Sequence, residues 1–314
     1  MSPRCSLVVN GKTVRVASGD TSVEAALADG MIAPTQATHG TGLLGQAPGP
    51  AARRTNARAH RPDTGRLAAL PPAADTALPD VVPSPAARRA GTLTEVTPLS
   101  PRVLQAVVTL TRPLPLEPGH QVEITLPGRR TAILSPSFRV DGGAELNELV
   151  FHLPRDPDAP SLAEALGGAV PLGSLARARG PLGRAYYRPG GGRLVLVSDG
   201  TGFAQIWSIA RAARHLESAR ETVLVVGAAD PLDLYMRPAL DWLAATGVAR
   251  IVMASDRLRQ RPPDVRPGPL TAHIPHLRAT DVVHVCGGAA TVGAVEVLAA
   301  AAGARCYPAV LDGA

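Results

Sequence analysis

The segment Arg193–Ala204, with the sequence RLVLVSDGTGFA, constrains the fold of this chain more than any other. The apolar run Leu194–Val197 stops at a turn with two glycines, Ser198–Gly202, and helical spacing begins directly after it. The apolar residues that follow lie on one face of a helix: Phe203, Ile206, Trp207, Ala210 and Ala213. A strand, a glycine-rich turn and a helix N-terminus together suit a diphosphate, because glycines let the backbone approach closely and free N–H groups point at the anion. An ordinary tight turn also favours glycine, so both interpretations stay open.

Strands and helices alternate from residue 193 onward. Apolar runs predict strands, and helical spacing predicts helices at Phe203–Leu216, Leu232–Ala245 and Ala290–Ala301. The predicted strands are Leu194–Val197, Thr222–Val226, Arg250–Ala254 and Val282–Cys286. This alternation predicts a parallel sheet with helices on both faces. Ligands of such sheets bind beyond the carboxyl ends of the strands, and the glycine-rich turns fall at that edge.

Upstream of residue 188 the pattern is typical of β structure. Short strands between Pro and Gly residues predict a small antiparallel barrel, with strands at Gly91–Thr97, Val103–Thr111, Gln121–Pro127, Leu149–Leu153 and Ser174–Arg179. At the N-terminus, Ser6–Val9 and Thr13–Val16 predict a hairpin, and Thr21 with Glu24 predicts the start of a short helix. From about residue 36 to residue 90 periodicity disappears, and we expect an irregular segment.

Composition limits the classes of function. Aromatic residues make up 3% of the chain and hydrophobic residues 45%, so Ala, Val and Leu build the cores of the two or three domains expected at this length. Residues 51–90 hold seven arginines against three aspartates and no Phe, Trp or Tyr. This segment is either a solvated basic linker or a surface that attracts an acidic protein, and nucleic acid is not expected. We also expect a cytoplasmic protein that does not enter a membrane, because neither a signal pattern nor an apolar stretch of roughly 20 residues is found.

Three predicted strands end in sequences that together resemble one family. These ends are Ser198–Gly202, Gly227–Pro231 and Cys286–Gly288. The dinucleotide fingerprint G-x-G-x-x-G is not met, because Gln205 stands at the third glycine. The set instead resembles the NAD(P)H domain of the ferredoxin–NADP reductase family, in which the first turn reads A-G-G-T-G-[IF]-A-P, the second strand ends G-A-R and the fourth ends C-G-P. The run Gly180–Gly183 also resembles the G-P-x-G of that family.

The resemblance implies a multidomain fold of β and α/β parts. Residues 1–50 correspond to a degenerate β-grasp, ferredoxin-like N-terminus, and residues 51–90 to an Ala/Pro/Arg-rich linker. Residues 91–190 correspond to an antiparallel β-barrel of the FAD-binding type, and residues 191–314 to a parallel α/β domain of the NAD(P)H-binding type.

The ferredoxin-like part lacks the ligands of a [2Fe–2S] cluster. Oxygenase reductases of this type hold the cluster in a P-Y-S-C-x-x-G-x-C-G-x-C loop, to which Pro34–Gly45 corresponds. The thiolate positions are occupied by Ala37, Gly42 and Gly45, and the cysteines of the chain are Cys5, Cys286 and Cys306. Cluster irons need thiolate or imidazole ligands. We therefore expect no cluster and no other metal.

The flavin-binding motif of the family is also changed. Its R-x-Y-S sequence, in which the arginine grips the FAD diphosphate and the tyrosine packs on the ring, corresponds to Ala132–Ser135. The resemblance leaves Ser135 as a flavin contact, and Arg129 or Arg130 substitutes for the lost arginine only if the strand register differs. Ser161 corresponds to a second diphosphate contact, although a serine before a helix is commonly an N-cap.

The nicotinamide side is closer to the family pattern. The resemblance assigns cofactor binding to Gly200, Thr201, Gly202, Gly227 and Gly287, and a catalytic position near the nicotinamide to Cys286, which is equally well explained as a small buried residue. Asp199 replaces a glycine and disfavours the diphosphate unless its carboxylate points away or meets an arginine. Ala229 stands where some relatives have an arginine for a 2′-phosphate, so NADH is favoured over NADPH.

These features predict a reductase-like electron-transfer component of an oxygenase system. Electrons pass from NAD(P)H to FAD and then to an external oxygenase or ferredoxin component, without an iron–sulfur cluster of this chain. The alternative is a cofactor-free pseudo-reductase that acts as a binding, assembly or regulatory partner, because the cofactor motifs depart from the family while the scaffold pattern persists. A poorly folding pseudogene product is a third interpretation.

Overall fold

The computed structural model describes residues 4–9, 12–17, 85–156, 161–257 and 260–311. Contacts divide the chain into two units, Met1–Asp75 and Thr76–Ala314. In the first unit, β1 (Arg4–Val9) and β2 (Lys12–Ala17) pair antiparallel, which confirms the predicted hairpin. The turn of the hairpin, the helix predicted from Thr21 and the cluster-loop region lie outside the described residues, so the ferredoxin-like part stays a prediction.

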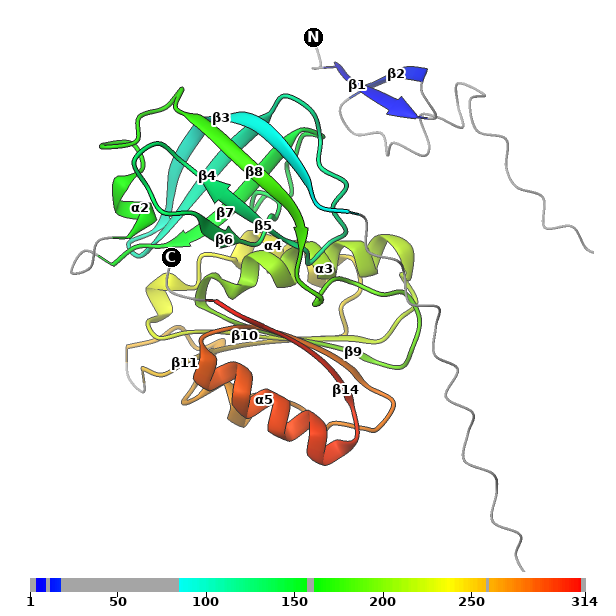
Figure 1. Ribbon diagram of the computed structural model, residues 1–314. Helices are drawn as coiled ribbons and strands as arrows, with labels where there is room; N and C mark the ends of the chain where they lie inside the picture. Colours follow the sequence, from blue (N-terminus) through cyan, green and yellow to red (C-terminus); the bar gives the residue numbers. More distant parts are fainter. Residues whose placement is uncertain (1–3, 10–11, 18–84, 157–160, 258–259, 312–314) are drawn as a thin grey trace, which may run out of the picture. The chain divides into compact units, whose positions relative to one another are not determined.

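Six antiparallel strands form the first half of the second unit (Figure 1). Their order across the sheet is β6-β5-β8-β3-β4-β7. The strands are β3 (Ala87–Ser100), β4 (Val103–Leu110), β5 (Gln121–Thr125), β6 (Ala132–Leu134), β7 (Glu148–Pro154) and β8 (Leu175–Leu182). A bridge between Ser137 and Val150 joins the segment after β6 to β7, and so links the two edges of the sheet. The short helix α2 (Leu162–Ala165) follows β7. The antiparallel prediction is confirmed.

Two boundaries of this sheet differ from the prediction. β6 was not expected, because three residues between a turn and a proline carry no alternating pattern. β3 begins at Ala87, so the last residues of the segment predicted as a 51–90 linker belong to the barrel. Residues Ala87–Ala90 pair with Arg177–Gly180 of β8, and these ladder hydrogen bonds hold a strand that has little hydrophobic character of its own.

The second half of this unit is a parallel sheet with the order β12-β11-β10-β9-β13-β14. Its strands are β9 (Leu194–Asp199), β10 (Thr222–Ala228), β11 (Arg250–Ser255), β12 (Val265–Pro267), β13 (Val282–Gly287) and β14 (Arg305–Val310). The strand order reverses beside β9. From β9 the chain adds β10, β11 and β12 toward one edge of the sheet, and it then returns to add β13 and β14 on the other side of β9. The predicted parallel α/β class is confirmed, and the edge of the sheet beside β9 is where ligands of such folds bind.

Helices cover both faces of the parallel sheet (Figure 1). The helix α3 (Phe203–Leu216) and α4 (Arg237–Ala245) pack on one face, and α5 (Ala289–Ala302) packs on the other with the 3₁₀ turn η3 (Leu270–His273). The first half of α3 is wholly buried, because it lies between the sheet and the barrel. Among the helices of the described ranges, none has the length and apolar character needed to cross a membrane.

The prediction of a helix over Leu232–Ala245 was wrong in its first turn. Pro231–Asp233 form a separate 3₁₀ turn, η2, which Asp230 caps by accepting a hydrogen bond from the Leu232 N–H at 3.0 Å. The helix α4 begins only at Arg237, with a proline in its first turn, where a missing N–H costs nothing.

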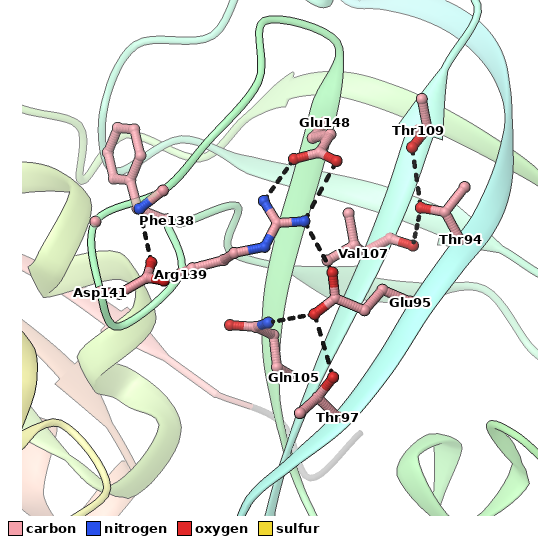
Figure 2. Close-up of polar contacts among 12 residues, drawn as sticks. Thr94, Glu95, Thr97, Gln105, Val107, Thr109, Phe138, Arg139, Asp141 and Glu148 are labelled. Carbon is pink, nitrogen blue, oxygen red and sulfur yellow. Dashed lines mark hydrogen bonds and ion pairs between the residues drawn. The ribbon is translucent and has the colours of Figure 1, made fainter. Parts of the chain in front are cut away.

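Arg139 joins the segment after β6 to the rest of the barrel (Figure 2). Its guanidinium lies 2.6 Å from Glu148 of β7 and 2.9 Å from Glu95 of β3. Gln105 of β4 donates to the same Glu95 at 2.9 Å. The hydrogen bond from Arg139 lowers the pKa of Glu95. The backbone carbonyl of Arg139 accepts a hydrogen bond from the Trp207 indole at 3.1 Å, so this network also fixes the barrel against α3.

Candidate functional site

A pocket of about 270 Å³ lies between the barrel and the parallel sheet. One wall comes from β6, β7 and the residues beside them, and the other from the end of β9 and the start of α3. Most of the lining is apolar: Ile133, Leu134, Phe151, Leu153, Pro154, Ala204 and Leu311. Its polar side chains are Ser135, His152, Asp199 and Thr201. A slot of this character binds a flat apolar ring with a few polar groups at its rim.

The glycine turn at the end of β9 forms a 3₁₀ turn, η1 (Gly200–Gly202), which runs directly into α3. Gly200 has φ of +54°, and nothing lies within 4 Å of a Cβ added there, so a ligand can approach the protein backbone closely at this position. A Cβ added at Gly202 would lie 2.2 Å from the carbonyl oxygen of Cys286, so Gly202 is required by the packing of α3 against β13. Gly200 and Thr201 line the pocket.

The other two predicted glycines have packing reasons of their own. A Cβ at Gly227 would lie 2.7 Å from a methyl of Leu270, and one at Gly287 would lie 2.6 Å from the Cβ of Asp199. Gly227 also lines a second pocket of about 290 Å³ at the ends of β9, β10 and β11. These glycines keep the carboxyl edge of the sheet closely packed, and their cofactor role stays a prediction.

The Asp199 carboxylate is tied to α5. Its Oδ2 accepts a hydrogen bond from the Thr291 hydroxyl at 2.8 Å, in the first turn of that helix, where a negative charge is stabilised by the helix dipole. Asp199 lines both pockets. Its partner is therefore a hydroxyl rather than the arginine considered from sequence, and its charge remains beside the glycine turn.

Gln205 connects four parts of the site. Its Nε2 lies 2.9 Å from the Gly119 carbonyl and 3.4 Å from the Ala185 carbonyl. Its Oε1 accepts hydrogen bonds from the Ser135 hydroxyl at 3.0 Å and from the Cys286 thiol at 3.3 Å. All four hydrogen-bonding positions of the amide are therefore used, and the side chain is 1% exposed.

Cys286 lies behind Gln205 and is not among the residues that line the pocket. Burial raises the pKa of its thiol to about 12, so the sulfur stays protonated and cannot act as a nucleophile at neutral pH. Its geometry fits a small buried residue, and the catalytic assignment stays a prediction.

His152 of β7 forms a second link between barrel and sheet. Its Nε2 lies 3.2 Å from the Phe138 carbonyl, which can only accept, so Nε2 carries the proton. Its Nδ1 then accepts from the Tyr235 hydroxyl at 3.1 Å. Burial lowers the pKa of His152 to about 4, and the ring is neutral at physiological pH.

The residues matched to the flavin motif are only partly brought together. Ile133, Leu134 and Ser135 line the pocket, and Ala132 does not. Ala132 and Leu134 also pack with the barrel core, while Ile133 between them is 54% exposed. Ser161 caps α2, accepting a hydrogen bond from the Glu164 N–H at 3.2 Å, and does not line the pocket.

Three residues of the site were not predicted from the sequence. Gln205 was noted only as a departure from a motif, and His152 and Thr291 belong to no motif. Each acts through partners far away in the chain, such as Ser135, 70 positions before Gln205. Within the described ranges, His, Cys, Asp and Glu side chains form no group of three that could hold a metal ion.

No family model matches the chain. It is 29% identical over 248 residues to the reductase subunit of an aromatic O-demethylase from Amycolatopsis sp., across 72% of this chain and 73% of that protein. It is 28% identical over 183 residues to the ferredoxin–NAD(P)⁺ reductase component of a naphthalene 1,2-dioxygenase system from Pseudomonas putida, across 58% and 53% of the two chains. Its fold resembles that of a cytochrome P450 reductase from Amycolatopsis, with a TM-score of 0.63 and 24% identity across 73% and 72%.

Proposed function

We propose that the chain is a member of the ferredoxin–NADP reductase superfamily and the reductase component of an oxygenase system, because its curated relatives are reductase components of such systems. It takes electrons from a nicotinamide dinucleotide, passes them through a flavin and delivers them to a separate acceptor protein. The observation that carries this proposal is the apolar pocket between the barrel and the carboxyl edge of the parallel sheet. The cofactor-free alternative is not favoured, because the relatives are reductase components.

The pocket fits the ring system of a flavin better than it fits a polar ligand. Phe151 and Leu153 supply flat and aliphatic surface from β7, and Ser135 and Thr201 supply polar groups beside it. A bound flavin supplies the exchange between two-electron and one-electron transfer that such a component needs. The protein's part is to hold the ring dry and oriented, and the size of the pocket is that of the ring rather than of a whole dinucleotide.

The diphosphate of FAD finds less support among the described residues. Arginine is not among the residues that line the pocket, and Ser161 is already engaged as a helix cap. Arg129 and Arg130 lie exposed in the turn before β6. We therefore expect most of the binding free energy to come from the ring, and a smaller contribution from the phosphates than in relatives with the R-x-Y-S motif.

NADH is the coenzyme that the second pocket fits better. The charged residues among its lining are Asp199 and Asp256, and both are acidic. A 2′-phosphate brought close to these carboxylates would be repelled. Arg257, which follows β11, is paired with Asp230 at 2.6 Å. These charges agree with the preference for NADH inferred from Ala229.

The acceptor must carry its own redox centre. Three cysteines, at positions 5, 286 and 306, are too few for a four-thiolate cluster, and Cys286 is already committed to Gln205. We propose that the one-electron carrier resides in a ferredoxin or in the oxygenase itself.

The proposal is tested by visible spectroscopy. Protein purified without added cofactor is incubated with FAD, FMN or riboflavin and desalted, and its absorption spectrum is recorded before and after anaerobic addition of NADH and of NADPH. We expect flavin bands approaching one equivalent, similar affinities for the three flavins, and bleaching at lower concentrations of NADH than of NADPH. The absence of flavin bands from protein with a folded circular-dichroism spectrum would contradict the proposal.

A further inference from the structure

A buried guanidinium nitrogen lies without a hydrogen-bond partner at the amino edge of the parallel sheet. It belongs to Arg220, which precedes β10 and whose side chain is 6% exposed. The Nε of Arg220 donates to the Gly192 carbonyl at 3.0 Å, and its Nη1 lies 3.1 Å from Glu217. Its Nη2 forms no hydrogen bond within the part of the chain that the structure describes. A buried charged donor costs free energy unless an acceptor meets it, so this nitrogen marks a place for an acceptor.

Arg305 brings a second guanidinium to the same point. It is the exposed first residue of β14, and its side chain forms neither a hydrogen bond nor an ion pair with any described residue. A Cβ added at Gly191 would lie 3.0 Å from Nη2 of Arg305 and 3.4 Å from Nη2 of Arg220. Gly191 is itself exposed. Two unpaired nitrogens therefore flank one glycine that solvent reaches.

Positive charge exceeds negative charge around this point. Arg188 stacks over the Tyr307 ring at 4.5 Å and donates to two backbone carbonyls, so it adds a charge that no carboxylate balances. Of the described carboxylates, Glu217 alone pairs with a guanidinium of this group. His284 stacks on the other side of the cluster, 4.9 Å from Tyr307. Burial lowers the pKa of His284 to about 3, and the guanidiniums of Arg188 and Arg220 act in the same direction.

We propose that Arg220 and Arg305 form a binding site for a small tetrahedral oxyanion, of which inorganic phosphate and sulfate are examples. Two oxygens of one anion accept hydrogen bonds from the two Nη2 donors, as oxyanions do from arginines. The anion supplies the acceptor that Arg220 lacks and the negative charge that Arg305 lacks. The site lies at the amino edge of the sheet, whereas the two pockets described above lie at the carboxyl edge, so it is independent of the proposed coenzyme and flavin sites.

Equilibrium dialysis of the full chain against radiolabelled phosphate, at constant ionic strength, measures this binding directly. The measurement is made with FAD and NADH present, because these compounds compete for any phosphate site at the carboxyl edge. We expect one phosphate per chain, displaced by sulfate but not by equal concentrations of chloride or acetate. The absence of bound phosphate, or its displacement by acetate as readily as by sulfate, would overturn the proposal.

Arg305→Gln locates the site. Arg305 is exposed, so the variant should fold, and loss of one charge-assisted hydrogen bond should raise the dissociation constant for phosphate about tenfold or more. Arg250→Gln is the matched control, because Arg250 is the exposed first residue of β11 at the same edge of the sheet, on the other side of β9. It should leave the dissociation constant unchanged. Equal effects of the two substitutions would show only a general influence of charge and would overturn the proposal.

Arg220→Lys tests the buried donor. A lysine keeps the positive charge beside Glu217 but has no Nη2, so the affinity for phosphate should again fall about tenfold. Unchanged affinity in this variant would overturn the role of Arg220. Should Arg220→Lys not fold, the comparison of Arg305→Gln with Arg250→Gln still decides whether the site exists.

Denaturant unfolding separates anion binding from a structural role of Arg305. Without phosphate, Arg305→Gln should be at least as stable as the unmodified protein, because it removes a repulsion between guanidiniums. Phosphate should stabilise the unmodified protein in a saturable manner, as a ligand of the folded state does, and should stabilise the variant less. Equal losses of stability with and without phosphate would mean that Arg305 supports the fold rather than an anion, and would overturn the proposal. Because neither dialysis nor unfolding requires bound flavin, failure of the proposed function would leave this test intact.

Discussion

Gly202 lies directly against Cys286, and a Cβ at Gly202 would be 2.2 Å from the cysteine's carbonyl oxygen. This contact joins the turn η1, at the N-cap of α3, to the end of β13, and both segments carry motifs that resemble those of the family. The glycine that a coenzyme motif would explain is thus explained by packing alone. Loss of activity in a Gly202 variant would therefore say little about the coenzyme.

Gly202→Ala should destabilise the fold far more than Gly200→Asn does. A Cβ at 2.2 Å from a backbone carbonyl requires movement of α3 or β13, and we expect a loss of at least about 3 kcal/mol in the free energy of unfolding. At Gly200 nothing lies within 4 Å, and asparagine tolerates its positive φ at a cost of about 1 kcal/mol. Denaturant unfolding followed by circular dichroism measures both. Equal stability of the two variants would contradict this account of the turn.

Ile133→Trp should block flavin binding without unfolding the barrel. Ile133 lines the pocket and is 54% exposed, so the larger indole side chain should occupy space in the pocket rather than disturb the packing of the core. We expect the affinity for FAD to fall by more than about tenfold, since a displaced ring loses its apolar contacts. Leu175→Trp is the matched control, because Leu175 is an exposed residue of β8 outside the pocket lining. Undiminished binding to the Ile133 variant would remove this pocket from consideration as the flavin site.

Most elements could be predicted because their signal is local. The apolar runs of β9, β10, β11 and β13 and the one-sided pattern of α3 are each complete within a few residues. β14 was missed because its sequence RCYPAV contains a proline, which an edge strand tolerates on its unpaired side. β12 was missed because it has three residues and pairs only with β11.

The candidate site could be predicted less well, because its contacts are not local. Ser135 and the Gly200–Thr201 turn were found through motifs, and the structure brings them to one pocket. The partners that control them were not found: Thr291 meets Asp199 from 92 positions away, and Gln205 meets Cys286 from 81. Ser161 has a motif position but serves as a cap, since the helix that follows needs one.

Asp199→Asn should strengthen NADH binding. The amide oxygen can still accept from the Thr291 hydroxyl, while the negative charge beside the glycine turn is removed. Removing a repulsion of about 1 kcal/mol should lower the dissociation constant for NADH about three- to tenfold at low salt, and high salt should reduce the difference. Glu221→Gln is the matched control. Glu221 is exposed and lies just before the start of β10, at the opposite edge of the sheet, so this substitution should leave the affinity for NADH unchanged. An unchanged affinity in Asp199→Asn would place the diphosphate away from this carboxylate.

Stability should decrease with acid because two histidines are buried in the neutral form. Burial lowers the pKa of His152 to about 4 and that of His284 to about 3, whereas an unfolded histidine titrates near 6.5. Below pH about 6.5 the unfolded chain binds protons that the folded chain does not. The stabilisation is therefore complete above that pH and is lost progressively as the pH falls toward about 4 for His152 and about 3 for His284.

His152→Asn should reduce this pH dependence. Between pH 6 and pH 5, each such histidine contributes a slope approaching about 1.4 kcal/mol per pH unit, and carboxylates contribute little because they titrate lower. The free energy of unfolding, measured by denaturant titration, should therefore fall less steeply with decreasing pH in the variant than in the unmodified protein. The difference in slope corresponds to about one fewer proton taken up on unfolding. His215→Asn, at an exposed position of α3, should keep the original slope. Equal slopes for the His152 variant and the unmodified protein would mean that His152 is protonated in the folded state. The hydrogen bond from the Tyr235 hydroxyl to Nδ1 would then not exist, because a protonated ring has no acceptor.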